Sequence, residues 1–100
     1  MTGTWRNTNA RGRVPLLVLD EGHRLTSDFG TAQAEVYAES LGSDEVMAFS
    51  ARYAREDLDV RVQANVKGGV LVVAYFTKFL DGSGRAPYFH REFYWREAAS

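Results

Sequence analysis

The chain has 100 residues, a formal net charge of −1, and 45% hydrophobic, 13% aromatic and 25% charged residues. This size and composition indicate one soluble globular domain spanning 1–100, and the charge balance gives no sign of binding to nucleic acid or to an anionic membrane. Cysteine is absent, which excludes disulfides and thiolate metal sites. Without a signal-peptide pattern or an apolar run of about 20 residues, a cytoplasmic location is expected.

Alternation of apolar and polar residues, interrupted by short turns, recurs along the chain. It predicts strands over 5–8, 13–20, 24–30, 32–39, 45–53, 58–66, 70–79 and 87–97. Within them, Pro15 indicates an edge or bulge position, because proline cannot donate to a ladder. The alanines of 32–39 also allow a short helix, and 40–44 is predicted as a loop.

About eight short strands joined mostly by hairpins indicate an antiparallel sandwich or barrel. A meander of this length closes naturally into an up-and-down barrel, which removes the exposed edges of the sheet. The predicted fold is therefore all-β, with an interior that side chains fill or that holds one small ligand.

The segment TGTWRN, residues 2–7, resembles the first strand of the avidin and streptavidin family, Thr-Gly-x-Trp-x-Asn, and contains the Gly-x-Trp signature of calycins. The strand layout of most of the chain is similar. The resemblance implies that Trp5 closes one barrel end, that Arg96 packs across it, and that Asn7 points inward to bind a ligand. Biotin is not expected, because avidins use several interior tryptophans and this chain has only Trp5 and Trp95.

The segment DGSGR, residues 81–85, precedes the last predicted strand. Together with the Trp-x-Asn-Thr start, it resembles small bacterial proteins that carry the same turn. Its glycines are typical of a hairpin loop that needs positive φ. No helix and no Lys-Ser/Thr pair follow it, which argues against a phosphate-binding loop.

The last two predicted strands are apolar or aromatic on both faces. A strand with one face in water should alternate, so the outer face is expected to be covered. The pattern favours a homo-oligomer, a dimer or tetramer, that associates through these strands. Packing against the chain's own loops is the alternative, and the sequence leaves open which face of 70–79 and 87–96 points inward.

His90 and Glu92 share one face of the last strand, beside Tyr88. A histidine next to a carboxylate among aromatic side chains is a candidate acid–base pair; an interface cluster of polar pairs is the alternative. Tyr53 and Tyr75 either line a cavity or fill core space. No metal site is expected, because the two histidines have no clustered partners.

These patterns support three hypotheses. The first is a barrel that binds a small, mostly apolar molecule through Asn7, Tyr53, Tyr75, Tyr88 and His90. The second is a cofactor-independent enzyme, such as a cyclase or isomerase of bacterial natural-product biosynthesis, with His90 and Glu92 as catalytic residues. The third is a structural or oligomerisation module without a ligand.

Overall fold

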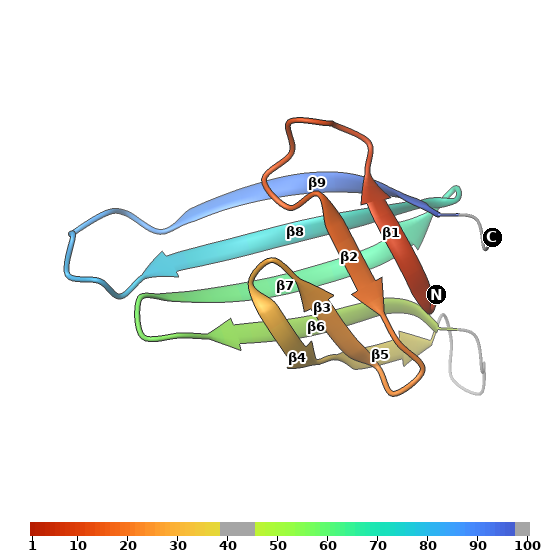
Figure 1. Cartoon of the computed structure of the whole chain (residues 1–100), viewed down its shortest axis with the longest axis horizontal. Coiled ribbons are helices and arrows are strands. Elements are labelled where there is room, and N and C mark those ends of the chain that lie inside the picture. The colour runs from red at the N-terminus through yellow and green to blue at the C-terminus, as the bar shows by residue number, and fades with distance from the viewer. Residues whose placement is uncertain (39–45, 98–100) are drawn as a thin grey trace.

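The computed structural model describes residues 1–38 and 46–97, which form an all-β fold (Figure 1). The strands are β1 (Gly3–Asn7), β2 (Leu16–Leu19), β3 (Arg24–Ser27), β4 (Gly30–Gln33), β5 (Glu35–Ala38), β6 (Val46–Ala54), β7 (Leu58–Lys67), β8 (Val70–Phe79) and β9 (Tyr88–Arg96). They form one nine-stranded sheet in the order β4-β3-β2-β1-β9-β8-β7-β6-β5, and neighbouring strands pair antiparallel. The predicted up-and-down meander is confirmed.

β1 closes this meander into a barrel, because it pairs with strands from both ends of the chain. Trp5 lies opposite Leu17 of β2 and opposite Arg96 of β9. β4 and β5 stand at the two ends of the sheet order, yet only Ala34 separates them in the chain. The barrel is therefore nearly closed, with its hydrogen-bonded pairing interrupted where β4 passes into β5.

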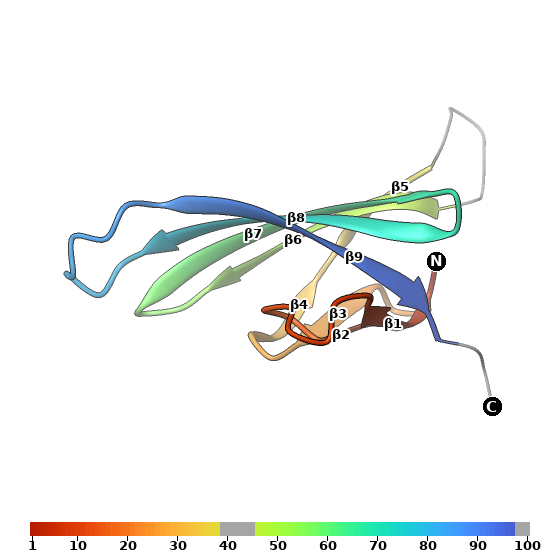
Figure 2. The same ribbon diagram turned by 90° about the horizontal axis from the view of Figure 1, so that it is seen from above.

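The strands fall into two length classes. β6 to β9 have 9 or 10 residues each, whereas β1 to β5 have 4 or 5. In Figure 2 the long strands form one layer, and β1 to β4 lie beneath part of it. The long strands continue past the ends of the short ones. They can do so because each long strand keeps its hydrogen bonds to a neighbouring long strand. This overhang leaves one end of the long strands' inner face only partly covered.

The interior of the barrel is a packed core. Inward-facing side chains alternate with outward-facing ones along each long strand. The core consists of Trp5, Val14, Leu17, Leu19, Leu25, Ala34, Phe49, Ala51, Tyr53, Val60, Val62, Ala64, Leu71, Val73, Tyr75 and Tyr94. Burying aliphatic and aromatic side chains supplies most of the stability of so small a domain, at roughly 1.5–3 kcal/mol for each large side chain.

The burial pattern settles which face of β9 points inward. Glu92 and Tyr94 are only 8% and 0% exposed. The alternate residues are 49%, 45% and 57% exposed for Phe89, Phe93 and Trp95 respectively. His90 therefore shares the inner face with Glu92 and Tyr94, and Phe89, Phe93 and Trp95 at the alternate positions face outward.

The structure has one strand more than the predicted eight, because the chain turns within the predicted strand 24–30. The Ser27 hydroxyl accepts a hydrogen bond from the Phe29 amide at 3.1 Å, and Gly30 has a φ of 117°. A positive φ is readily adopted only by glycine. Ser-Asp-Phe-Gly is therefore a turn between β3 and β4, and its phenylalanine made it resemble a strand.

The predicted strand 32–39 is divided by the buried Ala34, with the end of β4 on one side and β5 on the other. Its helical alternative is wrong. β2 begins directly after Pro15, so that proline precedes the ladder instead of interrupting it. The predicted loop at 40–44 lies outside the described residues. Among the residues that are described, no helix is long and apolar enough to cross a membrane.

Candidate functional site

His90 lies on the inner face of β9, toward the overhanging end of the long strands. Its imidazole is stacked between two tyrosine rings. The ring centroids are 4.9 Å apart for Tyr75, with 15° between the planes, and 5.4 Å apart for Tyr88, with 22°. Tyr75 of β8 is directly opposite His90 in the register, and Tyr88 precedes it by one period of the strand. Three flat side chains therefore stack across adjacent positions of the inner face.

These rings belong to a longer series. From Tyr75 it continues to Phe29 at 6.4 Å, and from Phe29 to Tyr53 at 5.7 Å. In the other direction Tyr88 stacks with Phe79 at 5.8 Å. The spacings are those of favourable aromatic pairs. We call this series the aromatic row: Tyr53, Phe29, Tyr75, His90, Tyr88 and Phe79.

An arginine lies near each end of the aromatic row. The Arg13 guanidinium carbon is 5.9 Å from the centre of the Phe29 ring, and that of Arg85 is 3.8 Å from the centre of Phe79. Cations over ring faces are attracted by the negative charge of the π-system. Sequence reasoning gave none of these three residues a site role, because it placed Arg13 and Phe29 in the predicted strands 13–20 and 24–30 and Arg85 in a turn, whereas all three lie outside the strands.

The loop that presents Arg85 is held by its own hydrogen bonds. The Asp81 carboxylate accepts bonds from the Ser83 amide at 3.0 Å and from Arg85 at 2.5 Å. Gly82 and Gly84 have φ of 74° and 72°. The Ser83 contacts and the Arg85 guanidinium lower the pKa of Asp81 to about 2. The segment is a self-contained hairpin loop, as its glycines predicted.

The hydrogen-bonding capacity of His90 is unused. Both ring nitrogens, Nδ1 and Nε2, are buried and have no hydrogen-bond partner among the described residues. The carboxylate of Glu92 is close, but its Oε2 is 3.7 Å from Nε2, which is too long for a hydrogen bond. Buried polar atoms without partners are rare in folded proteins. The side chain is nevertheless 24% exposed through its other atoms, so the ring is near solvent.

Glu92 is bonded to the loop between β1 and β2 instead of to His90. Its Oε1 accepts from the amide of Arg13, and its Oε2 accepts from the amide of Val14 at 3.2 Å and from the Tyr94 hydroxyl at 3.2 Å. A buried carboxylate is tolerated when donors surround it in this way. Glu92 therefore holds the loop against the barrel interior.

Two tyrosines extend this network across the core. The hydroxyl oxygens of Tyr75 and Tyr94 are 2.6 Å apart, and the Tyr94 hydroxyl is 2.8 Å from the carbonyl oxygen of Val14. Tyr94 has one proton, which goes to Val14 or Glu92, so Tyr75 donates to the Tyr94 oxygen. Burial raises the pKa of both phenols, and the carboxylate of Glu92 raises that of Tyr94 further. Both therefore stay protonated at neutral pH.

Asn7 lies apart from the other four predicted ligand-binding residues. Its Nδ2 donates to the Val14 carbonyl at 3.0 Å, and its Oδ1 accepts from the Asn9 amide at 2.8 Å. The loop passes so close that a Cβ at Gly12 would lie 2.1 Å from Nδ2. Asn7 is connected to the aromatic row only indirectly. The Val14 carbonyl also accepts from the Tyr94 hydroxyl, which is hydrogen-bonded to Tyr75 of the row.

Tyr53 forms the deep end of the aromatic row and ties two layers together. It is 5% exposed, and its hydroxyl donates to the Leu25 carbonyl of β3 at 2.8 Å. Burial raises the pKa of this phenol. Tyr53 thus fills core space and links β6 to β3, while Tyr88, at 41% exposed, forms the accessible end.

Trp5 of β1 and Arg96 of β9 lie where β9 ends, at the opposite end of that strand from Tyr88 and His90. Trp5 is 3% exposed, and its Nε1 donates to the Met1 carbonyl at 3.0 Å. Arg96 is opposite Trp5 in the register, but its guanidinium reaches over Gly3 and donates to the Thr2 carbonyl at 2.7 Å. Trp5 therefore closes this end of the core, and Arg96 fastens the N-terminal residues across it.

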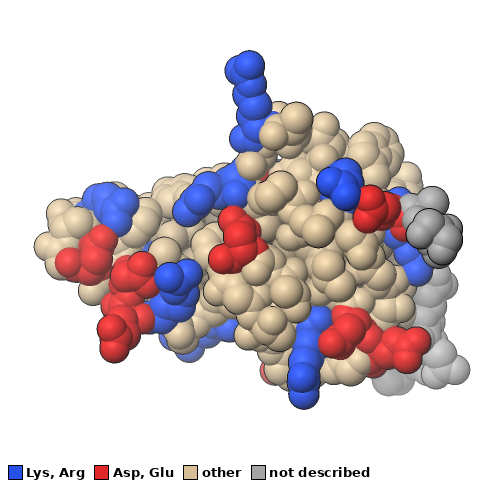
Figure 3. Space-filling view, viewed as in Figure 1, with Lys and Arg blue, Asp and Glu red and all other residues tan. Residues whose placement is uncertain are grey.

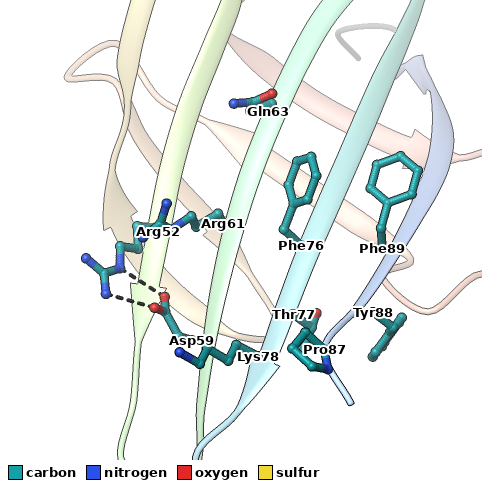
Figure 4. Close-up of a pocket in the computed structure, with 10 residues that line it drawn as sticks. All are labelled: Arg52, Asp59, Arg61, Gln63, Phe76, Thr77, Lys78, Pro87, Tyr88 and Phe89. Carbon is teal, nitrogen blue, oxygen red and sulfur yellow. Dashed lines mark hydrogen bonds and ion pairs between the residues drawn. The ribbon is translucent and has the colours of Figure 1, made fainter.

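The outer face of the long strands carries a hollow of about 640 Å³ (Figure 4). One side is aromatic, with Phe76 and Phe89 side by side at 5.0 Å between centroids. The other side is polar, with Arg61, Gln63 and the Arg52–Asp59 ion pair. Arg61 and Gln63 are thus on the outer face of β7.

Charge is distributed differently on the face made by the short strands. In Figure 3, which views the molecule from that side, acidic and basic side chains are interspersed around a broad uncharged surface. Within residues 1–38 and 46–97, no group of three or more His, Cys, Asp or Glu side chains is arranged to hold a metal ion. The aromatic row and the outer face of β8 and β9 remain as the two features that call for a functional explanation.

Comparison with known proteins adds no further assignment. No family model, curated protein or solved structure matches this chain.

Proposed function

We propose that this protein is a small-molecule-binding barrel whose ligand docks at the aromatic row and hydrogen-bonds to His90. The observation that carries the proposal is the imidazole, which is stacked between Tyr75 and Tyr88 with both nitrogens buried and without a hydrogen-bond partner in the described part of the chain. Ligand sites are mostly apolar and aromatic, with a few polar groups that orient the ligand. The aromatic row has this composition, with His90 as its orienting group.

The ligand enters from the exposed end of the row. Tyr88 is 41% exposed, whereas Tyr75 is fully buried. A ligand therefore meets the Tyr88 ring first and reaches the imidazole by stacking beside that ring or displacing it. The ligand that suits this environment is small and largely apolar, with a flat portion to stack on tyrosine and one polar group to pair with a ring nitrogen.

The avidin-like start of the chain supports a ligand-binding barrel, but biotin is not proposed. The family's asparagine faces the ligand, whereas the amide of Asn7 bonds to Val14 and Asn9 of its own loop. The site proposed here lies toward the opposite end of β9 from Trp5. In it, Asn7 is a positioning residue that fixes the loop carrying Arg13.

A cofactor-independent enzyme, such as a cyclase or isomerase of bacterial natural-product biosynthesis, is the second candidate. The 3.7 Å between His90 Nε2 and Glu92 Oε2 favours it, because such pairs tighten when substrate binds. Binding without turnover ranks first, because Glu92 already accepts hydrogen bonds from the amides of Arg13 and Val14. His90 remains available to hydrogen-bond a ligand in either case.

Native mass spectrometry of protein purified from its own host tests the proposal. We expect a small molecule that is retained under gentle conditions and lost on denaturation. The variant His90→Phe keeps a flat ring between the tyrosines and removes both nitrogens, so it should lose the molecule. Leu80→Ser alters a 48% exposed side chain in the loop before β9 and should retain it.

The outcomes separate the three hypotheses. Conversion of the bound molecule by the wild type, with no conversion by His90→Phe, would indicate the enzyme. Retention of the molecule by His90→Phe would place the site elsewhere and overturn the proposal. If no molecule is retained, and heteroaromatic fragments leave the amide resonances of β8 and β9 unchanged, the protein is a structural module.

A further inference from the structure

The outer faces of β8 and β9 form a continuous apolar surface, which we call the outer stripe. Its residues are Val70, Val72, Ala74, Phe76, Phe89, Arg91, Phe93 and Trp95. The register places Val70 beside Trp95 and Val72 beside Phe93. The aromatic members are 40% to 57% exposed. An antiparallel sheet with one face on the core normally turns polar residues to water, so this face is expected to be covered.

The composition of the outer stripe matches the centre of a protein interface. Such centres are enriched in aromatic residues and arginine and depleted in lysine, aspartate and glutamate. The only charged member of the stripe is Arg91, and its guanidinium carbon is 5.4 Å from the centre of the Phe89 ring. The polar residues begin on the neighbouring strand, with Gln63 and Asn65 of β7. They are placed to form the rim.

The exposed aromatic area of the outer stripe amounts to about half of the surface that a standard dimer buries on each partner. With about 200 Å² for each aromatic side chain, the exposed fractions of Phe76, Phe89, Phe93 and Trp95 correspond to roughly 400 Å². This is about half of the ~800 Å² that each partner buries in a standard interface. The aliphatic members of the stripe and the polar rim on β7 supply further area. Apolar patches of a few hundred Å² on a single chain are often functional, and a larger patch marks an interaction site.

The two ends of the outer stripe are complementary to each other. Trp95, at one end, is the most exposed large apolar side chain of the described residues, at 57%. The hollow of Figure 4 lies at the other end, between Phe76 and Phe89 on one side and Arg61 on the other. A twofold axis through the middle of the stripe, near Ala74, brings the Trp95 of each copy to the hollow of the other.

We infer that the outer stripe is the interface of a homodimer, in which the Trp95 side chain of each copy enters the hollow of its partner. An isologous contact of this kind uses the same patch twice and closes after two copies. An indole in the hollow stacks against phenylalanine rings and meets the Arg61 guanidinium, a pairing that aromatic rings and cations favour. This inference does not rest on the proposed ligand site, which lies on the inner face and shares only Tyr88 with the lining of the hollow.

Sedimentation velocity over a range of concentrations tests the inference. We expect a dimer that dissociates on dilution, and iodide quenching of the exposed tryptophan that weakens as the dimer forms. Trp95→Glu removes the projecting ring, and Phe89→Glu places a charge in the hollow. Each should weaken dimerisation at least about 30-fold, the effect of losing an interface hot spot. Leu80→Glu adds the same charge away from the stripe and should leave the dimer intact.

Circular dichroism checks that each variant is folded, and because both altered side chains are about half exposed, the fold should survive. A wild-type monomer at about 100 μM, well above the dissociation constants of standard interfaces, would overturn the inference. Dimerisation that Trp95→Glu and Phe89→Glu leave unchanged would also overturn it. A monomer that binds a single-stranded oligonucleotide in a salt-dependent way would instead assign the face to nucleic acid, through its aromatic rings and arginines.

Discussion

The Tyr75–Tyr94 pair allows a direct test of the hydrogen-bond order inferred for the core. Tyr75 is fully buried, and the Tyr94 oxygen is the acceptor of its hydroxyl proton, at 2.6 Å. Tyr94→Phe removes that acceptor and also the donor to the Val14 carbonyl. Tyr75→Phe removes only a donor, and the Tyr94 hydroxyl keeps Val14 and Glu92 as acceptors. Each substitution deletes one phenolic hydroxyl, but the two should lower the free energy of unfolding by different amounts.

The expected magnitudes follow from this asymmetry. A buried hydroxyl left without a partner costs about 1–3 kcal/mol, and a lost hydrogen bond with no orphaned group costs about 1 kcal/mol. Tyr94→Phe should therefore lower the free energy of unfolding by about 3 kcal/mol, and Tyr75→Phe by about 1 kcal/mol. The double variant has no orphaned Tyr75 hydroxyl, so its cost should be at least about 1 kcal/mol less than the sum of the single costs.

Urea unfolding measured by tryptophan fluorescence gives these free energies, because Trp5 lies in the core at 3% exposed. In a domain of this size, 1 kcal/mol corresponds to about 4–8 °C in the melting temperature, so thermal unfolding provides an independent measure. If Tyr94→Phe costs no more than Tyr75→Phe, or if the two costs simply add, the inferred hydrogen-bond order is wrong.

Two further predictions concern loops. Gly12→Ala should destabilise the protein by about 1–2 kcal/mol, because the new Cβ displaces the Asn7 amide from its hydrogen bonds; Gly22→Ala, whose Cβ meets only a flexible carboxylate at 3.4 Å, is the matched control in urea unfolding. Asp81, whose pKa is lowered to about 2, should stabilise its loop above the ordinary pKa of about 4 and lose that effect as the pH falls toward 2. Carboxyl NMR titration checks this, and an ordinary pKa for Asp81 would contradict the observed loop contacts.

Much of the fold was predictable from periodicity alone. The long strands alternate over enough residues for the pattern to be unambiguous, and the meander order followed from the short turns between them. The segments 24–30 and 32–39 were harder, because each combines the end of one strand with the start of the next. The turn at 27–30 contains serine, aspartate and glycine, but Phe29 made it resemble a strand, and this phenylalanine packs on Tyr53 and Tyr75.

The candidate site was predictable only in part, because the sequence does not show which alternate residues of β9 face inward; we call this choice the parity of the strand. On β9 both faces are aromatic, so the sequence pattern did not indicate which side packs on the core. The structure resolves this through Glu92, which is buried and accepts hydrogen bonds from two amides of the loop between β1 and β2. No local sequence pattern predicts the contact of Glu92 with Arg13 and Val14, which are far apart from it along the chain. For the same reason, Arg13 could not have been assigned to the site.

The parity of β9 also makes the two proposed sites separable by experiment. His90 and Trp95 lie on opposite faces of the same strand, so one substitution can alter each face while the other keeps its surface. His90→Phe should abolish ligand retention and leave the dimer intact, and Trp95→Glu should dissociate the dimer and leave the row from Tyr75 to Tyr88 in place. If Trp95→Glu monomers also lose the ligand while remaining folded, the two faces are coupled, and the binding site is complete only in the assembled protein.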